Sequence, residues 1–401
     1  RDVPEAHSPL SRSQPAKAVR ETPPRREIMA TSSPVVAASA AKAATPAEAA
    51  AKLGATYPHE QMATRPLDLN PAHWYAAIKW HYDGGTLNWP MIIYIGLCHY
   101  WAVLGLTRLA TVHTYTLLWA YVLWPITGLG ITAGVHRLWS HRSYTAGPAL
   151  RCLLMLMNSI ANQGSIFHWA RDHRVHHKHS ETTADPHNAQ RGFFYAHVGW
   201  LLCKKHPDVV KEGKKLDFND LKRDGFVMFQ RKLDPWFTMF MCFAFPGLVA
   251  KFGWGERFWD AVWVAGFLRY IFVLHSTWLV NSAAHIFGDH PYNEQWPAEN
   301  PIVSFFAVGE GWHNWHHQYP YDYAASEFGI TSQFNPTKLF IDFFCVIGMA
   351  SNPKRATSSW ERTKMKRDKG VFEKSNFVLC MEGYAARGAD AAEAYPAKKQ
   401  D

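Results

Sequence analysis

Four long apolar blocks separated by polar segments dominate the pattern of the chain. They cover residues 89–107, 112–135, 235–252 and 260–282. Each block is close to the ~20 residues that an α-helix needs to cross the hydrocarbon core of a bilayer. Arg269 interrupts the last block, so its side chain is expected to snorkel, to pair or to face the protein interior. The pattern predicts an all-α integral membrane protein with four transmembrane helices.

The four predicted spans form two hairpins with short connections, at residues 108–113 and 251–260. The long stretches at residues 136–234 and after residue 283 are basic, and residues 352–374 alone carry eight Lys or Arg against three acidic residues. By the positive-inside rule, both termini and the central stretch are expected in the cytosol, where they would form a helical cap.

The segments between and beyond the spans differ in composition. Residues 149–162 and 337–350 are apolar but too short to span a bilayer, so they are expected in the interface or in the cap. The folded domain is predicted at residues 71–350. Residues 1–70 are predicted to be a disordered tail, and residues 351–401 a basic, low-complexity tail.

The overall composition agrees with a membrane protein. Hydrophobic residues make up 48% of the chain and aromatic residues 14%, with 18 Trp, as expected for aromatic belts at the interfaces. The formal net charge of +9 would also suit a nucleic-acid binder. However, the basic residues are spread between apolar blocks and no nucleic-acid motif occurs, so anionic lipid or an acidic partner fits better. The six Cys form no C-x-x-C pair and are interpreted as reduced packing residues.

Histidines gather in four short motifs, HRLWSH, HRVHH, HNWHH and NSAAH. In H-x-x-H-H the histidines at i, i+3 and i+4 share one helix face, so two can bind one metal while the third reaches another. This motif occurs twice, which indicates a pseudo-symmetric pair of metals. The first two histidines are five residues apart, about 140° on an ideal helix, and suit a helix end. The nine candidates are His136, His141, His173, His176, His177, His285, His313, His316 and His317.

All four motifs fall on the same predicted side of the membrane, which independent histidines would have no reason to do. Imidazole suits Zn, Cu, Fe and Ni, and nine such donors without a thiolate cluster suit two redox iron ions with open positions for O2. A ligating histidine usually donates its other N–H to a carboxylate or carbonyl. Four acids are close enough in sequence, although each could be an ordinary surface acid: Asp172, Glu181, Asp185 and Glu310. The remaining histidines are interpreted as surface or interfacial residues, among them His99, His168, His179, His187, His197, His206, His275 and His290.

Taken together, these motifs resemble the membrane-bound acyl-CoA Δ9 (stearoyl-CoA) desaturases. The resemblance extends to WARDHRVHHKHSETTADPHN, QRGFFYAHVGWLL, WLVNSAAHIFGDHPY and GEGWHNWHHQYPYDY, and it covers residues 70–350. It implies a four-span di-iron enzyme that uses O2 and two electrons to introduce a cis double bond into a saturated acyl chain. It also implies that the nine histidines bind the irons and that Asn281 holds a metal-bound water.

The resemblance further implies contacts to an acyl-CoA substrate. Arg171 and Asp172 match CoA head-group contacts, and Lys204 and Lys205 match phosphate contacts. A lysine pair at a membrane surface could instead bind lipid headgroups.

Other residues match the wall of the acyl tunnel. Gln163, Trp169 and Thr277 match positions that bend the tunnel beside the irons. Where relatives often have Gln-Asn-Asp, this chain has Gln-Gly-Ser at 163–165, which puts an amide contact to the thioester in doubt.

The second span is predicted to close the far end of the tunnel and so to limit the length of the acyl chain. Gly128 and Trp124 precede His136 by eight and twelve residues, and so lie about 12 and 18 Å deeper at ~1.5 Å per residue. Gly128 could instead only allow close helix packing.

Partners and location follow from the same resemblance. No His-Pro-Gly-Gly haem motif occurs, so electrons are expected from cytochrome b5 and its reductase, or from ferredoxin in a plastid. The segment from Met29 is either a plastid transit peptide or an inert tail. A multi-pass protein of the endoplasmic reticulum with cytosolic termini is expected, with a chloroplast membrane as the alternative. An acyl-lipid desaturase and a di-iron lipid hydroxylase stay open, as does a metal transporter, which would place histidines inside the spans.

Overall fold

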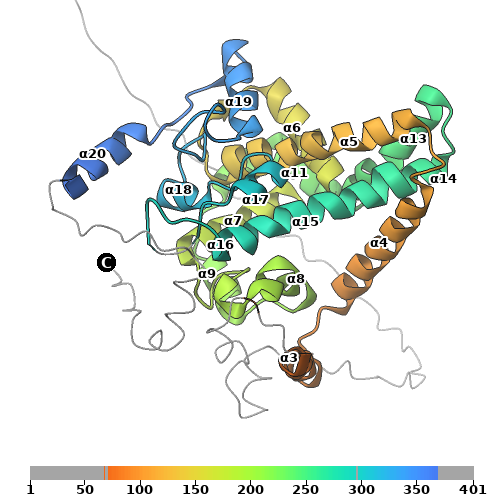
Figure 1. The fold of residues 1–401 in the computed structure, drawn as a ribbon, viewed down its shortest axis with the longest axis horizontal. Helices are drawn as coiled ribbons and strands as arrows, with labels where there is room; N and C mark the ends of the chain where they lie inside the picture. The colour runs from red at the N-terminus through yellow and green to blue at the C-terminus, as the bar shows by residue number, and fades with distance from the viewer. Residues whose placement is uncertain (1–66, 68–70, 295–296, 369–401) are drawn as a thin grey trace, which may run out of the picture. The chain divides into compact units, whose positions relative to one another are not determined.

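The structure is a computed structural model that describes residue 67 and residues 71–294 and 297–368. The predicted N-terminal tail and the end of the predicted C-terminal tail lie outside the described residues. Helices dominate this part of the chain (Figure 1), and its only strands are β1 (Thr145–Ala146) and β2 (Ala350–Ser351), which pair antiparallel. The helical fold class expected from the sequence is confirmed.

Four helices of the described chain are long and apolar enough to cross a membrane, and they overlap the four predicted spans. Their bounds are Trp89–Arg108, Thr114–Ser140, Trp236–Trp254 and Phe258–Ile286. The second and fourth extend further toward the histidine motifs than hydropathy predicts. In order, the spans consist of α4 (Trp89–Arg108); α5 (Thr114–Leu129) and η1 (Gly130–Ser140); α12 (Trp236–Met239), η4 (Phe240–Ala244) and α13 (Phe245–Trp254); and α14 (Phe258–Ala261), η5 (Val262–Leu268), α15 (Arg269–Asn281) and α16 (Ala283–Ile286).

The segments η1, η4 and η5 are π-helical. A π-helix bonds residue i to i+5, and such turns occur frequently at functional sites. A periodicity of 3.6 residues cannot reveal them in the sequence. The longest, η1, is buried along its whole length and carries His136.

The two short connections meet at one end of the helix bundle. The Glu256 carboxylate accepts hydrogen bonds from the His113 backbone N–H at 2.8 Å and from the Thr116 hydroxyl at 2.6 Å. His136 and His285 lie at the opposite ends of their spans. Both hairpins therefore turn at the end that is remote from the histidines.

Arg269, which interrupts the fourth span, faces the protein interior. Its guanidinium donates to the backbone carbonyls of Ala265, Ile160 and Cys242 at 3.1, 3.2 and 2.9 Å. These carbonyls belong to three different helices, so the buried charge joins the third and fourth spans to α6 (Pro148–Ala161).

The remaining helices form the cap. The two short apolar segments are α6 and α19 (Pro336–Val346), and they pack into one core through Leu154 and Ile341. The other cap helices are α3 (Pro71–Asp83), α7 (Ile166–His179), η2 (Ala189–Arg191), η3 (Tyr195–Gly199), α8 (Trp200–Leu202), α9 (Pro207–Gly213), α10 (Asn219–Arg223), α11 (Gly225–Leu233), α17 (Pro301–Phe306), α18 (His313–Gln318) and α20 (Thr357–Asp368).

The fold continues beyond residue 350, where the sequence predicts a low-complexity tail. The Lys354 N–H donates to the Ser143 carbonyl at 2.9 Å. Ala356 and Trp360 pack in one cluster with Trp315, the tryptophan of the HNWHH motif. A few apolar side chains in this basic segment thus pack against the cap, and the overall composition of the segment does not predict this packing.

Candidate metal centre

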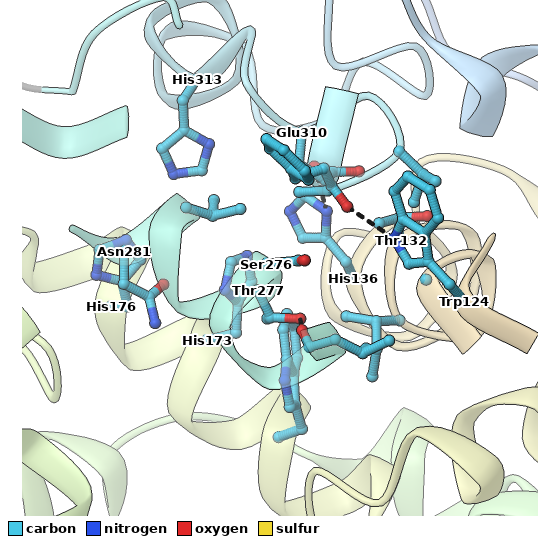
Figure 2. Close-up of a pocket in the computed structure, with 18 residues that line it drawn as sticks. Trp124, Thr132, His136, His173, His176, Ser276, Thr277, Asn281, Glu310 and His313 are labelled. Atoms are coloured by element: carbon cyan, nitrogen blue, oxygen red, sulfur yellow. Dashed lines mark hydrogen bonds and ion pairs between the residues drawn. The ribbon is translucent and has the colours of Figure 1, made fainter. Parts of the chain in front are cut away.

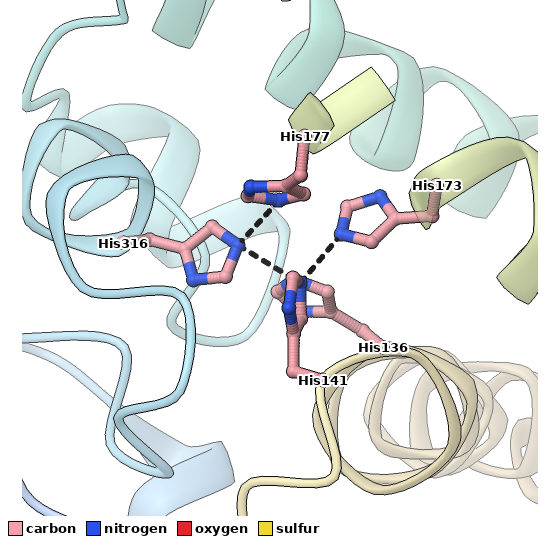
Figure 3. Close-up of side chains that lie close together, drawn as sticks. All are labelled: His136, His141, His173, His177 and His316. Atoms are coloured by element: carbon pink, nitrogen blue, oxygen red, sulfur yellow. Dashed lines mark hydrogen bonds between the residues drawn. The ribbon is translucent and has the colours of Figure 1, made fainter. Parts of the chain in front are cut away.

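Five histidines converge in a first group, contributed by η1, the residue that follows it, α7 and α18 (Figure 3). One ligand atom from each ring lies within 4.8 Å of the others. The Nε2 atoms of His136 and His316 are 2.9 Å apart, those of His141 and His173 are 2.8 Å apart, and those of His177 and His316 are 3.0 Å apart.

Four histidines form a second group, whose ligand atoms also lie within 4.8 Å of one another: His176, His285, His313 and His317. The Nε2 atoms of His176 and His317 are 3.3 Å apart. The structure therefore brings all nine candidate ligands together, in two adjacent groups.

The two H-x-x-H-H motifs contribute to both groups in opposite ways. In α7, positions i and i+4 (His173 and His177) join the first group, and position i+3 (His176) joins the second. In α18 the assignment is reversed, since only position i+3 (His316) joins the first group. This exchange is the geometric form of the pseudo-symmetry that the repeated motif indicates.

The first motif reaches the centre because of the π-helix. On an α-helix His136 and His141 would point apart. In η1 the His141 N–H instead donates to the His136 carbonyl at 3.1 Å, which is the i to i+5 bond of a π-helix. The two ring centroids are 4.8 Å apart.

Three carboxylates hold outer nitrogens of the ligating rings. Such a contact on Nδ1 fixes the ring so that Nε2 faces the centre. The distances are 2.9 Å from Glu310 to His136 Nδ1, 2.8 Å from Asp185 to His176 Nδ1 and 2.7 Å from Glu181 to His285 Nδ1.

Two of these carboxylates stay ionised despite their burial. Burial opposes the ionisation of Glu310, but Arg137, whose Nη2 lies 2.7 Å away, and then His136 lower the pKa of that carboxyl to about 2. Burial likewise opposes the ionisation of Asp185, but His176 lowers its pKa to about 2. Both remain hydrogen-bond acceptors at neutral pH.

Six of the ligating rings are held neutral. Burial, and then the charges of neighbouring groups, lower the pKa well below the usual 6.5 for His141, His173, His177, His313, His316 and His317. Neutral imidazole is the form that binds a metal. His176 differs from them, because burial opposes its protonation but Asp185 and then Glu181 raise its pKa above the usual value.

The donor set fits two metal ions. A neutral ring has one N–H, so the facing Nε2 atoms cannot all be satisfied by hydrogen bonds. Two nitrogens on one metal, each at about 2.0–2.1 Å, lie about 3.0–3.4 Å apart at adjacent positions, close to the observed separations. The buried Nε2 of His285 has no hydrogen-bond partner in the described part of the chain.

A cavity lies against both groups and runs between the second and fourth spans (Figure 2). His136 and His176 line it at the metal centre, and Gly128 and Trp124 line it from α5. Asn281 lines it from the end of α15.

The residues matched to the tunnel bend lie at this cavity. Trp169 lines it and stacks on His173 with ring centroids 4.7 Å apart. Thr277 also lines it, and Gln163 donates to the Thr277 hydroxyl at 2.9 Å. Gln163 therefore reaches the cavity wall through Thr277.

The residues matched to CoA contacts come together only in part. Arg171 Nε donates to Asp172 at 2.9 Å, and Lys205 binds the other oxygen of the same carboxylate. Although burial opposes it, His168, Lys205 and Arg171 lower the pKa of Asp172. Lys204 has a different partner, since its Nζ donates to the Gly85 carbonyl at 2.8 Å.

His187, which is expected from the sequence to be a surface or interfacial residue, is instead buried beside the second group. Its ring centroid is 4.8 Å from that of His176, and with His176 and Asp185 it forms a third cluster of possible ligands. The signal in the sequence is its place two residues after Asp185, in the segment ADPHN.

Comparison with known proteins agrees with this centre. The model of the family described as Fatty acid desaturase matches residues 113–324, which contain all nine histidines. The chain belongs to the fatty acid desaturase family.

Its relatives in this family are similar over most of their length. The chain is 50% identical to "Stearoyl-CoA desaturase 5" of Bos taurus over 280 residues, which cover 70% of this chain and 83% of the relative. It is 51% identical to "Acyl-CoA desaturase" of Cyprinus carpio over 273 residues (68% and 83%). It is 50% identical to "Stearoyl-CoA desaturase" of Homo sapiens over 280 residues (70% and 77%).

Proposed function

We propose that this member of the desaturase family is an acyl-CoA Δ9 desaturase, which introduces a cis double bond into a saturated fatty acyl chain with O2 and two electrons. The observation that carries the proposal is a largely apolar cavity that begins at a centre of nine histidines. The names of the relatives support the substrate class.

Two iron ions are the proposed cofactors, one for each histidine group. Bound iron would activate O2, the oxidant, to break an unactivated C–H bond, which no side chain can do. Glu310, Asp185 and Glu181 orient the ligating rings. Asn281, in the cavity wall beside the second group, is proposed to hold a water there.

The cavity wall is proposed to select which carbons react. Trp169 and Thr277, with Gln163 behind Thr277, shape the wall next to the histidines and so fix the register of the chain. Trp124 and Gly128 are proposed to end the tunnel.

The cluster around Asp172 is proposed to receive the CoA head group. Arg171 and Lys205 are its two fixed positive charges, and Asp172 holds both in place. Cations so positioned suit a phosphate-bearing polyanion. Lys204, which donates to the Gly85 carbonyl, is proposed to attract the CoA head group more weakly than Arg171 and Lys205 do.

Electrons are proposed to come from cytochrome b5 and its reductase. Each turnover removes two hydrogen atoms from the acyl chain and reduces O2 to two waters, so it requires two electrons from the carrier and two protons from solvent. The basic residues that flank the spans favour a cytosolic cap and cytosolic termini. The relatives are animal proteins, and animals lack plastids, which favours the endoplasmic reticulum over a chloroplast membrane.

Expression in a desaturase-deficient yeast tests the proposal. The wild-type chain is expected to restore growth and to produce fatty acids with a Δ9 cis double bond, detected by gas chromatography with location of the double bond. His176→Ala is expected to insert into the membrane and to yield none. Hydroxylated products, or double bonds in intact phospholipids before any appear in acyl-CoA, would support the hydroxylase or the acyl-lipid alternative instead.

A further inference from the structure

Three histidines outside the metal centre form a continuous hydrogen-bonded chain. His99 of α4 and His275 of α15 face each other with their Nε2 atoms 3.1 Å apart. His275 Nδ1 lies 2.9 Å from Nε2 of His197 in η3. His197 Nδ1 lies 3.0 Å from the hydroxyl of Ser282, between α15 and α16. The rings are linked in series, with His275 using one nitrogen for each neighbour, so the arrangement differs from the metal centre.

The position of these rings is unusual for surface histidines. His99 and His275 lie inside the first and fourth spans, where an ionisable group is costly and therefore a candidate for function. Phe193 stacks on His197, and Trp278 packs edge-on against His197 and His275.

Within the described residues, the three rings form no hydrogen bond or ion pair with a carboxylate, lysine or arginine side chain. Titratable groups on the same elements make other contacts. Tyr94 bonds Tyr270 and Asn162, and Tyr195 lies under the Arg191 guanidinium.

When its three rings are neutral, the hydrogen-bonded chain of histidines has one hydrogen too few to make all of its contacts. At one end His99 Nδ1 lies 2.8 Å from the Ile95 carbonyl, and at the other the Ser282 hydroxyl lies 2.9 Å from the Trp278 carbonyl. The five contacts of the chain need five hydrogens. Three neutral imidazoles and one hydroxyl supply four. The carbonyls of Ile95 and Trp278 at the two ends can only accept a hydrogen bond. One added proton therefore completes all five contacts.

The chain has an exposed side and a buried end. The three rings are partly exposed, His99 and His275 on the surface of the first and fourth spans and His197 outside the four spans, whereas Ser282 is fully buried. Burial and then the charge of His275 lower the pKa of His197 to about 4, so the histidine chain still lacks its fifth hydrogen at neutral pH. The residue before Ser282 is Asn281, which lines the cavity at the metal centre (Figure 2).

We propose that His99, His275 and His197 form a proton-transfer chain that takes up one proton at a time and passes it toward the cavity wall at Asn281. Each ring accepts a proton on one nitrogen and releases one from the other, so charge and atoms balance at every step. The inference rests on the proposed function, because desaturation consumes two protons from solvent in a buried site.

Infrared difference spectroscopy tests the chain without measuring turnover. The full-length, metal-loaded protein with ¹⁵N-labelled histidine is brought from about pH 8 to about pH 4.5, and imidazole ring bands are recorded for wild type and His275→Asn. Because the pKa of His197 is about 4, the difference between the two proteins at this pH is expected to contain the signal of about a quarter of one imidazolium, shared by the three rings. No imidazolium in that difference, or signals of two or three rings that titrate separately, would overturn the proposal.

Kinetics test the role of the chain in turnover. His275→Asn is expected to lower kcat roughly tenfold or more, to increase the solvent deuterium isotope effect and to leave the KM for acyl-CoA unchanged. Tyr94→Phe, five residues before His99 in the same helix, is the control and should change neither. If His275→Asn fails to insert, His99→Gln interrupts the far end of the same chain. Unchanged kcat and isotope effect would overturn the proposal, whereas a wild-type protein that desaturates nothing would refute the proposed function and leave the infrared result intact.

Discussion

At the scale of single residues, Lys204 and Lys205 are neighbours in sequence with different partners. Lys205 shares Asp172 with Arg171, whereas Lys204 donates to the Gly85 carbonyl. We expect Lys205→Ala to raise the KM for acyl-CoA roughly tenfold at nearly constant kcat, the mark of lost uniform binding. Lys204→Ala, the matched control, should change KM less than about twofold, as exposed charges usually do. Steady-state kinetics measure both, and an unchanged KM in both variants would favour lipid-headgroup binding.

Gly128 lies where the cavity and the packing of the second span meet. A Cβ atom there would lie 2.7 Å from Val308 Cγ2, and both residues line the cavity. Gly128→Leu is expected to shift the products from stearoyl toward palmitoyl and shorter chains, because the added side chain shortens the tunnel.

The product profile separates this effect from packing damage. Any loss of expression in Gly128→Leu would come from the clash with Val308. Adding Val308→Ala should relieve that clash and restore expression without restoring the longer products. If desaturation of palmitoyl and stearoyl chains fell by the same factor, the close approach to Val308 would be the whole effect of Gly128, and the tunnel-end assignment would be wrong.

Residue type and spacing were enough to predict which histidines gather. They could not reveal that His187 is buried beside His176, or that Lys204 turns away from Lys205 to Gly85. Those facts depend on which distant backbone lies next to a side chain, and a local pattern does not contain that information.

At the scale of elements, hydropathy predicted the four spans because each needs a long apolar run. It could not predict the π-helix η1, because a π-turn has no hydropathy signature. That turn is what aligns His136 with His141.

The packing of η1 on α6 leaves no room at Gly130. A Cβ there would lie 2.5 Å from the Asn158 backbone nitrogen and 2.5 Å from the Met157 carbonyl carbon. Backbone cannot move aside as a side-chain tip can, so Gly130→Ala is expected to destabilise the protein by about 1–3 kcal/mol. Thermal unfolding of the purified protein in detergent measures this. Gly96→Ala in the first span meets nothing within 4 Å and is the control; an equal loss in both variants would argue against the close contact.

At the scale of the whole molecule, the buried histidines make stability depend on pH. Six ligating rings have pKa values well below 6.5 in the folded protein, against about 6.5 when unfolded. Between these values the unfolded chain binds more protons, so stability rises with pH. The stability that these neutral rings contribute should be fully present above about pH 6.5 and should be lost progressively as the pH falls below that value. The Tm is therefore expected to decrease from about pH 7.5 to about pH 5.5, and a Tm that stays constant or rises would contradict the buried, neutral state of these rings.

The dependence of activity on bound iron shows whether the two histidine groups form a di-iron centre. One iron is proposed for the five-histidine group and one for the four-histidine group. Metal-depleted protein in nanodiscs is titrated with ferrous iron, and desaturation of stearoyl-CoA is measured against the iron-to-protein ratio determined by mass spectrometry. Activity is predicted to be absent without iron and to reach its plateau at two irons per chain. A plateau at one iron per chain, or full activity in the depleted protein, would rule out the proposed di-iron centre.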